Sequence, residues 1–65
     1  MVSELDIWRS AQLVIKNHGT RATAEARRRA AELEAKGDVA GSTTWHRIAQ
    51  AIAALQDDRP GGRVH

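Results

Sequence analysis

The 65-residue sequence contains no cysteine. It therefore forms neither a disulfide nor a thiolate metal site, and a reducing cytoplasm is the simplest location. Long apolar runs are also missing, because no stretch approaches the ~18 apolar residues that a membrane span requires. The first residues show no basic region followed by an apolar run, so we expect no signal peptide. These absences predict a cytoplasmic protein with no membrane segment.

The sequence also lacks a strong excess of positive or negative charge. Ten Lys and Arg residues against eight Asp and Glu residues leave a formal net charge of only +2. That charge is too small to indicate a polyanionic partner by itself. The sequence also has no glycine-rich phosphate loop, because the Pro-Gly-Gly of the C-terminal segment is followed by no helix pattern.

Residues that could carry chemistry are isolated from one another. His18 has no His or Asp three or four residues away, so a capping or partly buried structural role is favoured over metal binding. His46 and His65 complete no site. The serines have no histidine base at a suitable spacing, and a chain this short has little room for a ligand pocket. We expect no catalytic activity, no metal, no cofactor and no small-molecule substrate.

The apolar content is dominated by a small residue. The sequence is 42% hydrophobic and 28% charged, which is typical of a globular protein. Much of the hydrophobic share is alanine, however, and each alanine buries little area. At roughly 1.5–3 kcal/mol for each fully buried large side chain, the predicted core is modest. Self-association would help to stabilise it.

The spacing of apolar residues, and the glycines that follow the first two periodic segments, predict three helices over residues 3–18, 21–36 and 38–56. No run of four or more residues alternates with a period of two, so we expect an all-α fold. Short connections make neighbouring helices roughly antiparallel, which favours a compact three-helix bundle of up-down topology. A helical hairpin with a third helix laid across it is the alternative. The domain is predicted over 1–57, with a disordered tail at 58–65.

Each predicted helix has candidate capping residues at its start. Ser3 precedes the first helix, with Asp6 three residues later as a near capping box. Thr20 and Thr23 are alternative caps for the second helix. Asp38 is the predicted cap of the third.

The predicted buried faces follow helical spacing. The second helix buries mostly alanine, which allows close approach of its neighbours but contributes little area. In the third helix, Gly41 is predicted as a close-approach point and Ser42 is assigned to the polar side. Both tryptophans are expected in one core. The predicted faces comprise Ile7, Trp8, Ala11, Val14, Ile15 and His18; Ala22, Ala26, Ala30 and Leu33; and Thr44, Trp45, Ile48, Ile52 and Leu55.

Three consecutive arginines at residues 27–29 raise the question of nucleic-acid binding. Consecutive residues on a helix point about 100° apart, so the three side chains form no single patch. Glu25 and Glu32 lie three or four residues from Arg28 and Arg29, and Glu32 also lies four residues before Lys36. These pairs indicate a solvated face with ion pairs. A helix-turn-helix around the Gly-Asp corner is not supported either, because its usual buried positions would be occupied by leucine and threonine.

Apolar residues outside the predicted core are candidates for contact with a protein partner. Leu5, Leu13 and Ile15 of the first helix are the predicted contacts, either with a second copy of the chain or with another helical protein. The alternative function is a nucleic-acid-binding regulator, which the charge pattern disfavours. Its candidate contacts are Arg27, His46, Arg47 and Gln50, with Arg59 and Arg63 of the tail.

Two resemblances accompany these interpretations. The run AELEAKGDVAGSTTWHRIAQAI is similar to the turn of one tetratricopeptide repeat, which implies a helical hairpin. The segments DIWRSAQLVIKNHG (6–19), ARRRAAELEAKGD (26–38) and WHRIAQAI (45–52) together resemble a family of short bacterial proteins of unknown function. Its shared features are a Trp in the first helix, a His-Gly at its end, a Gly-Asp corner and a second Trp. This resemblance implies a small helical fold and a bacterial origin, and it carries over no activity.

Overall fold

The computed structural model describes residues 3–56, and this part of the chain is helical with no strand. Helix α1 spans Glu4–His18, a short 3₁₀ turn (η1) follows at Gly19–Arg21, α2 spans Ala22–Ala35 and α3 spans Val39–Gln56. The predicted helix bounds agree with these to within one residue at each end. The predicted tail at 58–65 lies outside the described residues.

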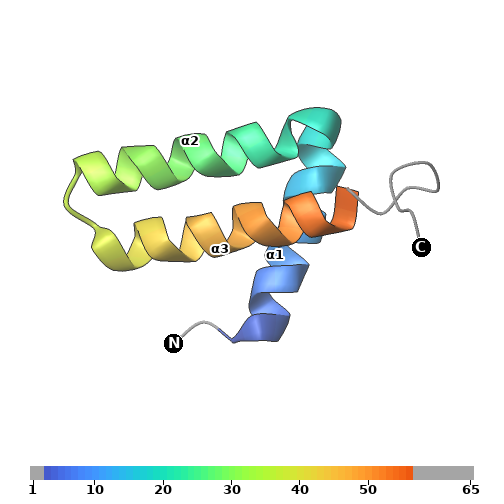
Figure 1. Ribbon diagram of the computed structural model, residues 1–65, viewed down its shortest axis with the longest axis horizontal. Coiled ribbons are helices and arrows are strands. Elements are labelled where there is room, and N and C mark those ends of the chain that lie inside the picture. The colour runs from blue at the N-terminus through green and yellow to red at the C-terminus, as the bar shows by residue number, and fades with distance from the viewer. Residues whose placement is uncertain (1–2, 57–65) are drawn as a thin grey trace.

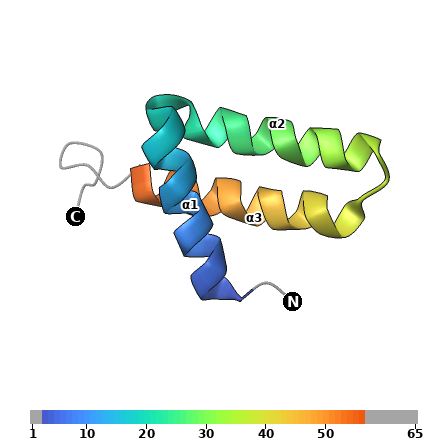
Figure 2. The same cartoon turned by 180° about the vertical axis from the view of Figure 1, so that it is seen from behind.

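The helices α2 and α3 lie side by side and antiparallel, and α1 crosses them steeply near the end where α2 begins and α3 finishes (Figures 1 and 2). The all-α prediction is confirmed, but the three-helix bundle is not, because α1 does not run along the hairpin. The arrangement matches the alternative of a hairpin with a third helix across it. The short turn η1 changes the chain direction between α1 and α2. Only two residues of α1, Ile7 and Ala11, are buried and hold it against the hairpin.

Two of the predicted helix caps are present. The Ser3 Oγ accepts a hydrogen bond from the backbone N–H of Asp6 at 3.1 Å. The Asp38 Oδ1 accepts one from the backbone N–H of Gly41 at 2.9 Å. Each bond satisfies one of the amide groups that the first turn of a helix leaves without a partner.

The predicted threonine caps of the second helix are wrong. Neither Thr20 nor Thr23 occupies the cap position of α2, which is held by Arg21 without a side-chain cap hydrogen bond. The 3₁₀ turn takes over this role, since the backbone N–H of Ala22 donates to the carbonyl oxygen of Gly19. A chain that enters a helix from such a turn has its first amide already bonded.

Glycine is required at the two corners, where φ is +58° at Gly19 and +85° at Gly37. Other residues adopt this region with strain. Gly41 has a role that the sequence did not indicate. A Cβ added there would lie closest to the Asp38 carboxylate, with its Oδ2 atom at 2.6 Å. The missing side chain at Gly41 therefore leaves room for the Asp38 cap.

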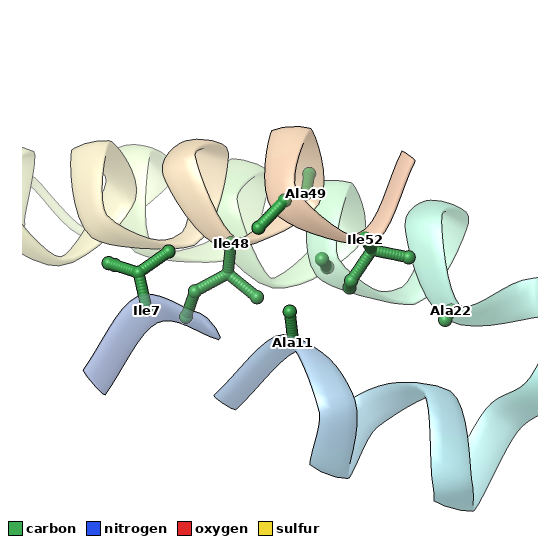
Figure 3. Close-up of a cluster of buried hydrophobic side chains, with 8 residues drawn as sticks. Ile7, Ala11, Ala22, Ile48, Ala49 and Ile52 are labelled. Atoms are coloured by element: carbon green, nitrogen blue, oxygen red, sulfur yellow. The ribbon is translucent and has the colours of Figure 1, made fainter. Parts of the chain in front are cut away.

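The core is built on alanine, as predicted (Figure 3). Three positions of α2 are fully buried at 0% exposure, and the half-buried Leu33 completes that face. Both tryptophans are half-buried and pack against a single cluster, together with Val14 and Ile15. The buried apolar residues are Ile7, Ala11, Ala22, Ala26, Ala30, Ile48, Ala49, Ala51 and Ile52.

The buried face of α3 is wider than the predicted stripe. Ser42, assigned to the polar side, is buried at 5% exposure, and Ala49 and Ala51 are buried as well. At about 100° per residue, the buried positions of α3 cover roughly half of its circumference. A helix that packs against two others, α1 and α2, must bury two faces, whereas a single stripe describes only one.

Two other predicted core residues lie at the surface. Leu55 of α3 is exposed at 36%. His18, the last residue of α1, is also exposed, so the apolar face of α1 ends at Ile15.

Beside His18, the carbonyl oxygen of Gly19 accepts a hydrogen bond from the Gln56 Nε2 at 2.8 Å, which connects the α1–α2 junction to the end of α3.

Candidate functional site

Large aliphatic side chains are more numerous on the surface than in the interior of the described chain. Three isoleucines are buried, whereas four large aliphatic residues are exposed by 36% or more. An isolated exposed leucine is ordinary, but an excess of this kind leaves apolar area that association could remove from water. The exposed set is Leu5 at 62%, Leu13 at 59%, Val39 at 71% and Leu55 at 36%.

The three predicted partner contacts of α1 do not form one surface. Leu5 lies one turn before Trp8, and Ile15 lies on the same side of the helix further along, at about 80° from Leu5. Ile15 is half-buried and packs against the core. Leu13 is about 160° from Ile15 around the helix, and it has Arg9 and Lys16 as its surface neighbours. Leu5 and Ile15 therefore flank Trp8, whereas Leu13 stands apart.

A shallow groove of about 250 Å³ lies between the N-terminal half of α1 and α3. Ile7 and Ala51 form its buried floor, and the other lining residues are at least partly exposed. The volume is below the ~300 Å³ at which ligand pockets usually begin, so the groove fits a side chain or a short segment better than a drug-sized molecule. It is lined by Glu4, Ile7 and Trp8 from α1 and by Arg47, Gln50, Ala51 and Ala54 from α3.

The structure separates the predicted nucleic-acid contacts. Arg47 and Gln50 line the groove together with Trp8. His46 is exposed on α3 but does not line the groove, and Arg27 is exposed on α2. The two arginines of this set therefore lie on different helices, and the tail arginines fall outside the described residues.

Two members of the arginine triplet, Arg28 and Arg29, pair with glutamates of their own helix, as the spacing predicts. Arg28 pairs with Glu25 at 2.6 Å and also with Glu32, and the Arg29 Nε lies 3.0 Å from the same Glu25 carboxylate. The Arg29 guanidinium carbon also lies 5.2 Å from the ring centroid of Trp45, within cation–π range. Within residues 3–56, the predicted pairs of Glu32 with Arg29 and with Lys36 are absent.

This arrangement changes the acidity of one carboxyl group. Hydrogen bonds from Arg28, and then from Arg29, lower the pKa of Glu25 from 4.5 to about 2. The hydrogen bond with Glu25, together with the charges of Glu25 and Glu32, raises the pKa of Arg28. The charge of the two arginines is thus directed at a glutamate on their own helix, which leaves a weaker field for a phosphate backbone.

Other kinds of site find no support in the described part of the chain. Among residues 3–56, no three His, Asp or Glu side chains gather closely enough to hold a metal ion. None of the helices in this range combines the length and apolar character needed to cross a membrane.

No protein-family model, curated protein or solved structure matches the chain. The resemblance to short bacterial proteins and the likeness to a tetratricopeptide hairpin therefore stay predictions. The candidate site is consequently defined by its own geometry.

The sequence indicated Leu5, Ile15, Arg47 and Gln50 as candidate contacts. It did not indicate that the two α1 residues flank Trp8, which lines the same groove as the two α3 residues. The signal that could have done so is the position of Trp8, one turn after Leu5 and two turns before Ile15 on the same side of α1. The α3 side of the groove consists partly of alanines. The local sequence does not indicate which alanines of α3 are buried and which are exposed. The groove itself depends on the steep crossing of α1 over α3, which the sequence does not specify.

Proposed function

We propose that this protein is a non-catalytic interaction module that buries exposed apolar residues of α1 against a second protein. The second protein is either another copy of the chain or a different helical partner. We further propose that it acts in the bacterial cytoplasm, which follows from the lack of cysteine and from the family resemblance. Association would also supply the additional helix packing that a full bundle has and a single copy lacks.

The observation that carries this proposal is the excess of large aliphatic side chains at the surface. Burial of such a side chain contributes roughly 1.5–3 kcal/mol, so moving Leu5 or Leu13 into an interface is a substantial gain for a chain with three buried isoleucines. Small domains of this kind often need association to supplement their core.

The test is the molar mass in solution, measured by light scattering up to high micromolar concentration. We expect a concentration-dependent dimer, or a stable complex with a partner, that Leu5→Glu weakens. Leu13→Glu tests the opposite side of α1. Val39→Glu is a matched control, because Val39 is 71% exposed at the far end of the hairpin. A monomer at every concentration, with unchanged stability and unchanged partners in both leucine variants, would refute the proposal.

A second candidate function is binding of single-stranded nucleic acid in the groove. Its support is the placement of Arg47 and Gln50 beside Trp8, since single strands are bound by aromatic rings and cations in combination. The carboxylate of Glu4 in the same groove opposes it. This function predicts binding that weakens steeply with salt. The absence of any mobility shift at low salt would remove it.

A further inference from the structure

The groove between α1 and α3 carries one acid and one base. Glu4 stands on its α1 side and Arg47 on its α3 side. Within residues 3–56, neither side chain takes part in an ion pair. Both are exposed, so each charge is available to a group that enters the groove from outside.

Apolar residues lie near these two charges. Leu5 follows Glu4 at about 100° around α1 and is 62% exposed outside the groove lining. Trp8, one turn after Leu5, is half-buried and lines the groove. On the α3 side, Ala51 and Ala54 are small enough for a side chain to approach the helix closely. The groove thus suits an incoming aliphatic side chain that is accompanied by an acidic residue, which would face Arg47. Leu5 and Glu4 of a second copy of the chain supply these two groups.

We propose that this groove is one half of a two-fold symmetric interface between two copies of the chain, in which Leu5 of each copy enters the groove of the other. Glu4 of each copy then faces Arg47 of the second copy. This inference rests on the proposed function and assigns its partner and its surface.

The symmetry of such an interface explains why the occupant is a second copy. In a two-fold interface, residue i of one copy contacts residue j of the other, and j contacts i in return. If the two-fold axis passes between Glu4 and Arg47, it places Glu4 of one copy opposite Arg47 of the other. The same operation places Arg47 of the first copy opposite Glu4 of the second. The surface is therefore complementary to itself in charge, and in shape because it offers both a protruding leucine and a groove.

The size of the groove limits the strength of the dimer. Stable interfaces bury about 800 Å² on each partner, whereas a groove of about 250 Å³ accommodates little more than one side chain. We therefore expect a weak dimer that is populated at high micromolar concentration and dissociates on dilution.

Charge reversal provides the test. In Glu4→Lys both facing positions become basic, and in Arg47→Glu both become acidic, so each single variant is expected to dimerise at least about tenfold more weakly than the wild type. An equimolar mixture of the two variants is expected to form a heterodimer, because each basic position then faces an acidic one. The double variant Glu4→Lys/Arg47→Glu is expected to dimerise again. Sedimentation velocity measures the wild type, the two single variants, their mixture and the double variant.

Arg27→Glu is the matched control, because it reverses an exposed arginine on α2 outside the groove. Thermal unfolding followed by circular dichroism verifies that each variant is folded. If a single reversal prevents folding, the neutral change at the same position, Glu4→Gln or Arg47→Gln, replaces it, with a smaller loss of dimer expected.

The outcomes separate this inference from the proposed function. Loss of dimer in both single variants together with recovery in the mixture supports the two-fold groove interface. A wild-type dimer that is unaffected by either reversal overturns the groove assignment and leaves the interaction function in place. A wild-type monomer at all concentrations overturns the groove interface, and the leucine variants then decide the broader proposal.

Discussion

The two ends of the α2–α3 hairpin differ in what holds them together. At the end where α2 begins, α1 packs across the hairpin, and the buried cluster there contains Ile7, Ile48 and Ile52. Towards the Gly37 corner only two helices are present, and the buried residues outside the cluster are Ala30 and Ser42. Two packed helices leave one side of each interface open to water, so a third helix is needed before a large side chain is fully enclosed.

The corner end relies on polar contacts instead of enclosed apolar ones. Asp38 caps α3, and the Thr44 Oγ1 donates to the carbonyl oxygen of Ala40 at 3.0 Å. The guanidinium of Arg29 covers the half-buried ring of Trp45. These contacts are mostly exposed, and exposed contacts contribute less than buried isoleucines do. The comparison predicts that substitutions at the α1 end cost much more stability than those at the corner.

The largest effect is expected from Ile52→Ala, because Ile52 is the largest side chain that is fully buried. Removing it leaves a cavity beneath α1, and such a change typically costs 2–5 kcal/mol, or about enough to unfold a chain of this size. Val39→Ala at the corner end is the control, with a change within about 0.5 kcal/mol. Urea unfolding measures both. Equal losses in the two variants would contradict the difference between the ends.

The next effect concerns the Asp38 cap. Asp38→Ala is expected to cost about 1 kcal/mol, since it removes the acceptor for the Gly41 N–H. Gly41→Ala is expected to give no gain in the wild type, because its Cβ displaces the Asp38 carboxylate. In the Asp38→Ala background, the same change is expected to stabilise by up to about 1 kcal/mol through helix propensity.

A double-mutant cycle by thermal unfolding measures this coupling between positions 38 and 41. Additive effects would mean that Gly41 serves some purpose other than leaving room for the cap.

Within the arginine triplet, Arg29 is expected to matter more than Arg27. Arg29→Met removes the contact with Trp45 and the pair with Glu25, which together contribute about 0.5–1 kcal/mol at an exposed site. Arg27→Met keeps a similar side-chain length and is expected to change stability by less than about 0.5 kcal/mol. Thermal melts of the two variants under identical conditions provide the comparison. A larger loss for Arg27 would contradict a stabilising contribution from the contact between Arg29 and Trp45.

The smallest effect is the pH dependence that arises from Glu25. Its pKa is lowered to about 2 in the folded chain, so its stabilising contribution is complete above about 4.5 and is lost as the pH falls towards 2. The melting temperature of the wild type is expected to fall more over this range than that of Glu25→Gln. Glu34→Gln serves as the control, because Glu34 forms no ion pair within the described chain. Parallel curves for the wild type and Glu25→Gln would contradict the assignment.

Local structure was predictable because its causes are local. The helices are determined by the capping residues Ser3 and Asp38 and by apolar residues that recur about every 3.6 positions. The observed helix bounds agree with the predicted ones within a residue. The cap of α2 was the exception, because a 3₁₀ turn at Gly19–Arg21 bonds the first amide in place of a threonine. Such a turn and a side-chain cap are alternatives that the sequence does not distinguish.

The arrangement of the helices and the candidate site were only partly predictable. Burial of Ala51 follows from α3 packing against α1 as well as α2, and the crossing of α1 decides where this second contact lies. The groove depends on the same crossing. Arg47 and Gln50 were identified by their chemistry, but their placement opposite Glu4 is a property of tertiary structure.

The hydrogen bond from Gln56 to the carbonyl oxygen of Gly19 has a consequence for motion. It anchors α1 at its C-terminal end, where the chain turns into α2, while the N-terminal half of α1 is attached through the buried Ile7 and the half-buried Trp8. An opening fluctuation would therefore lift the first turns of α1 away from α3 and leave the hairpin intact. Amide hydrogen exchange is expected to be faster in the first half of α1 than in its second half, with the slowest exchange near Ile52.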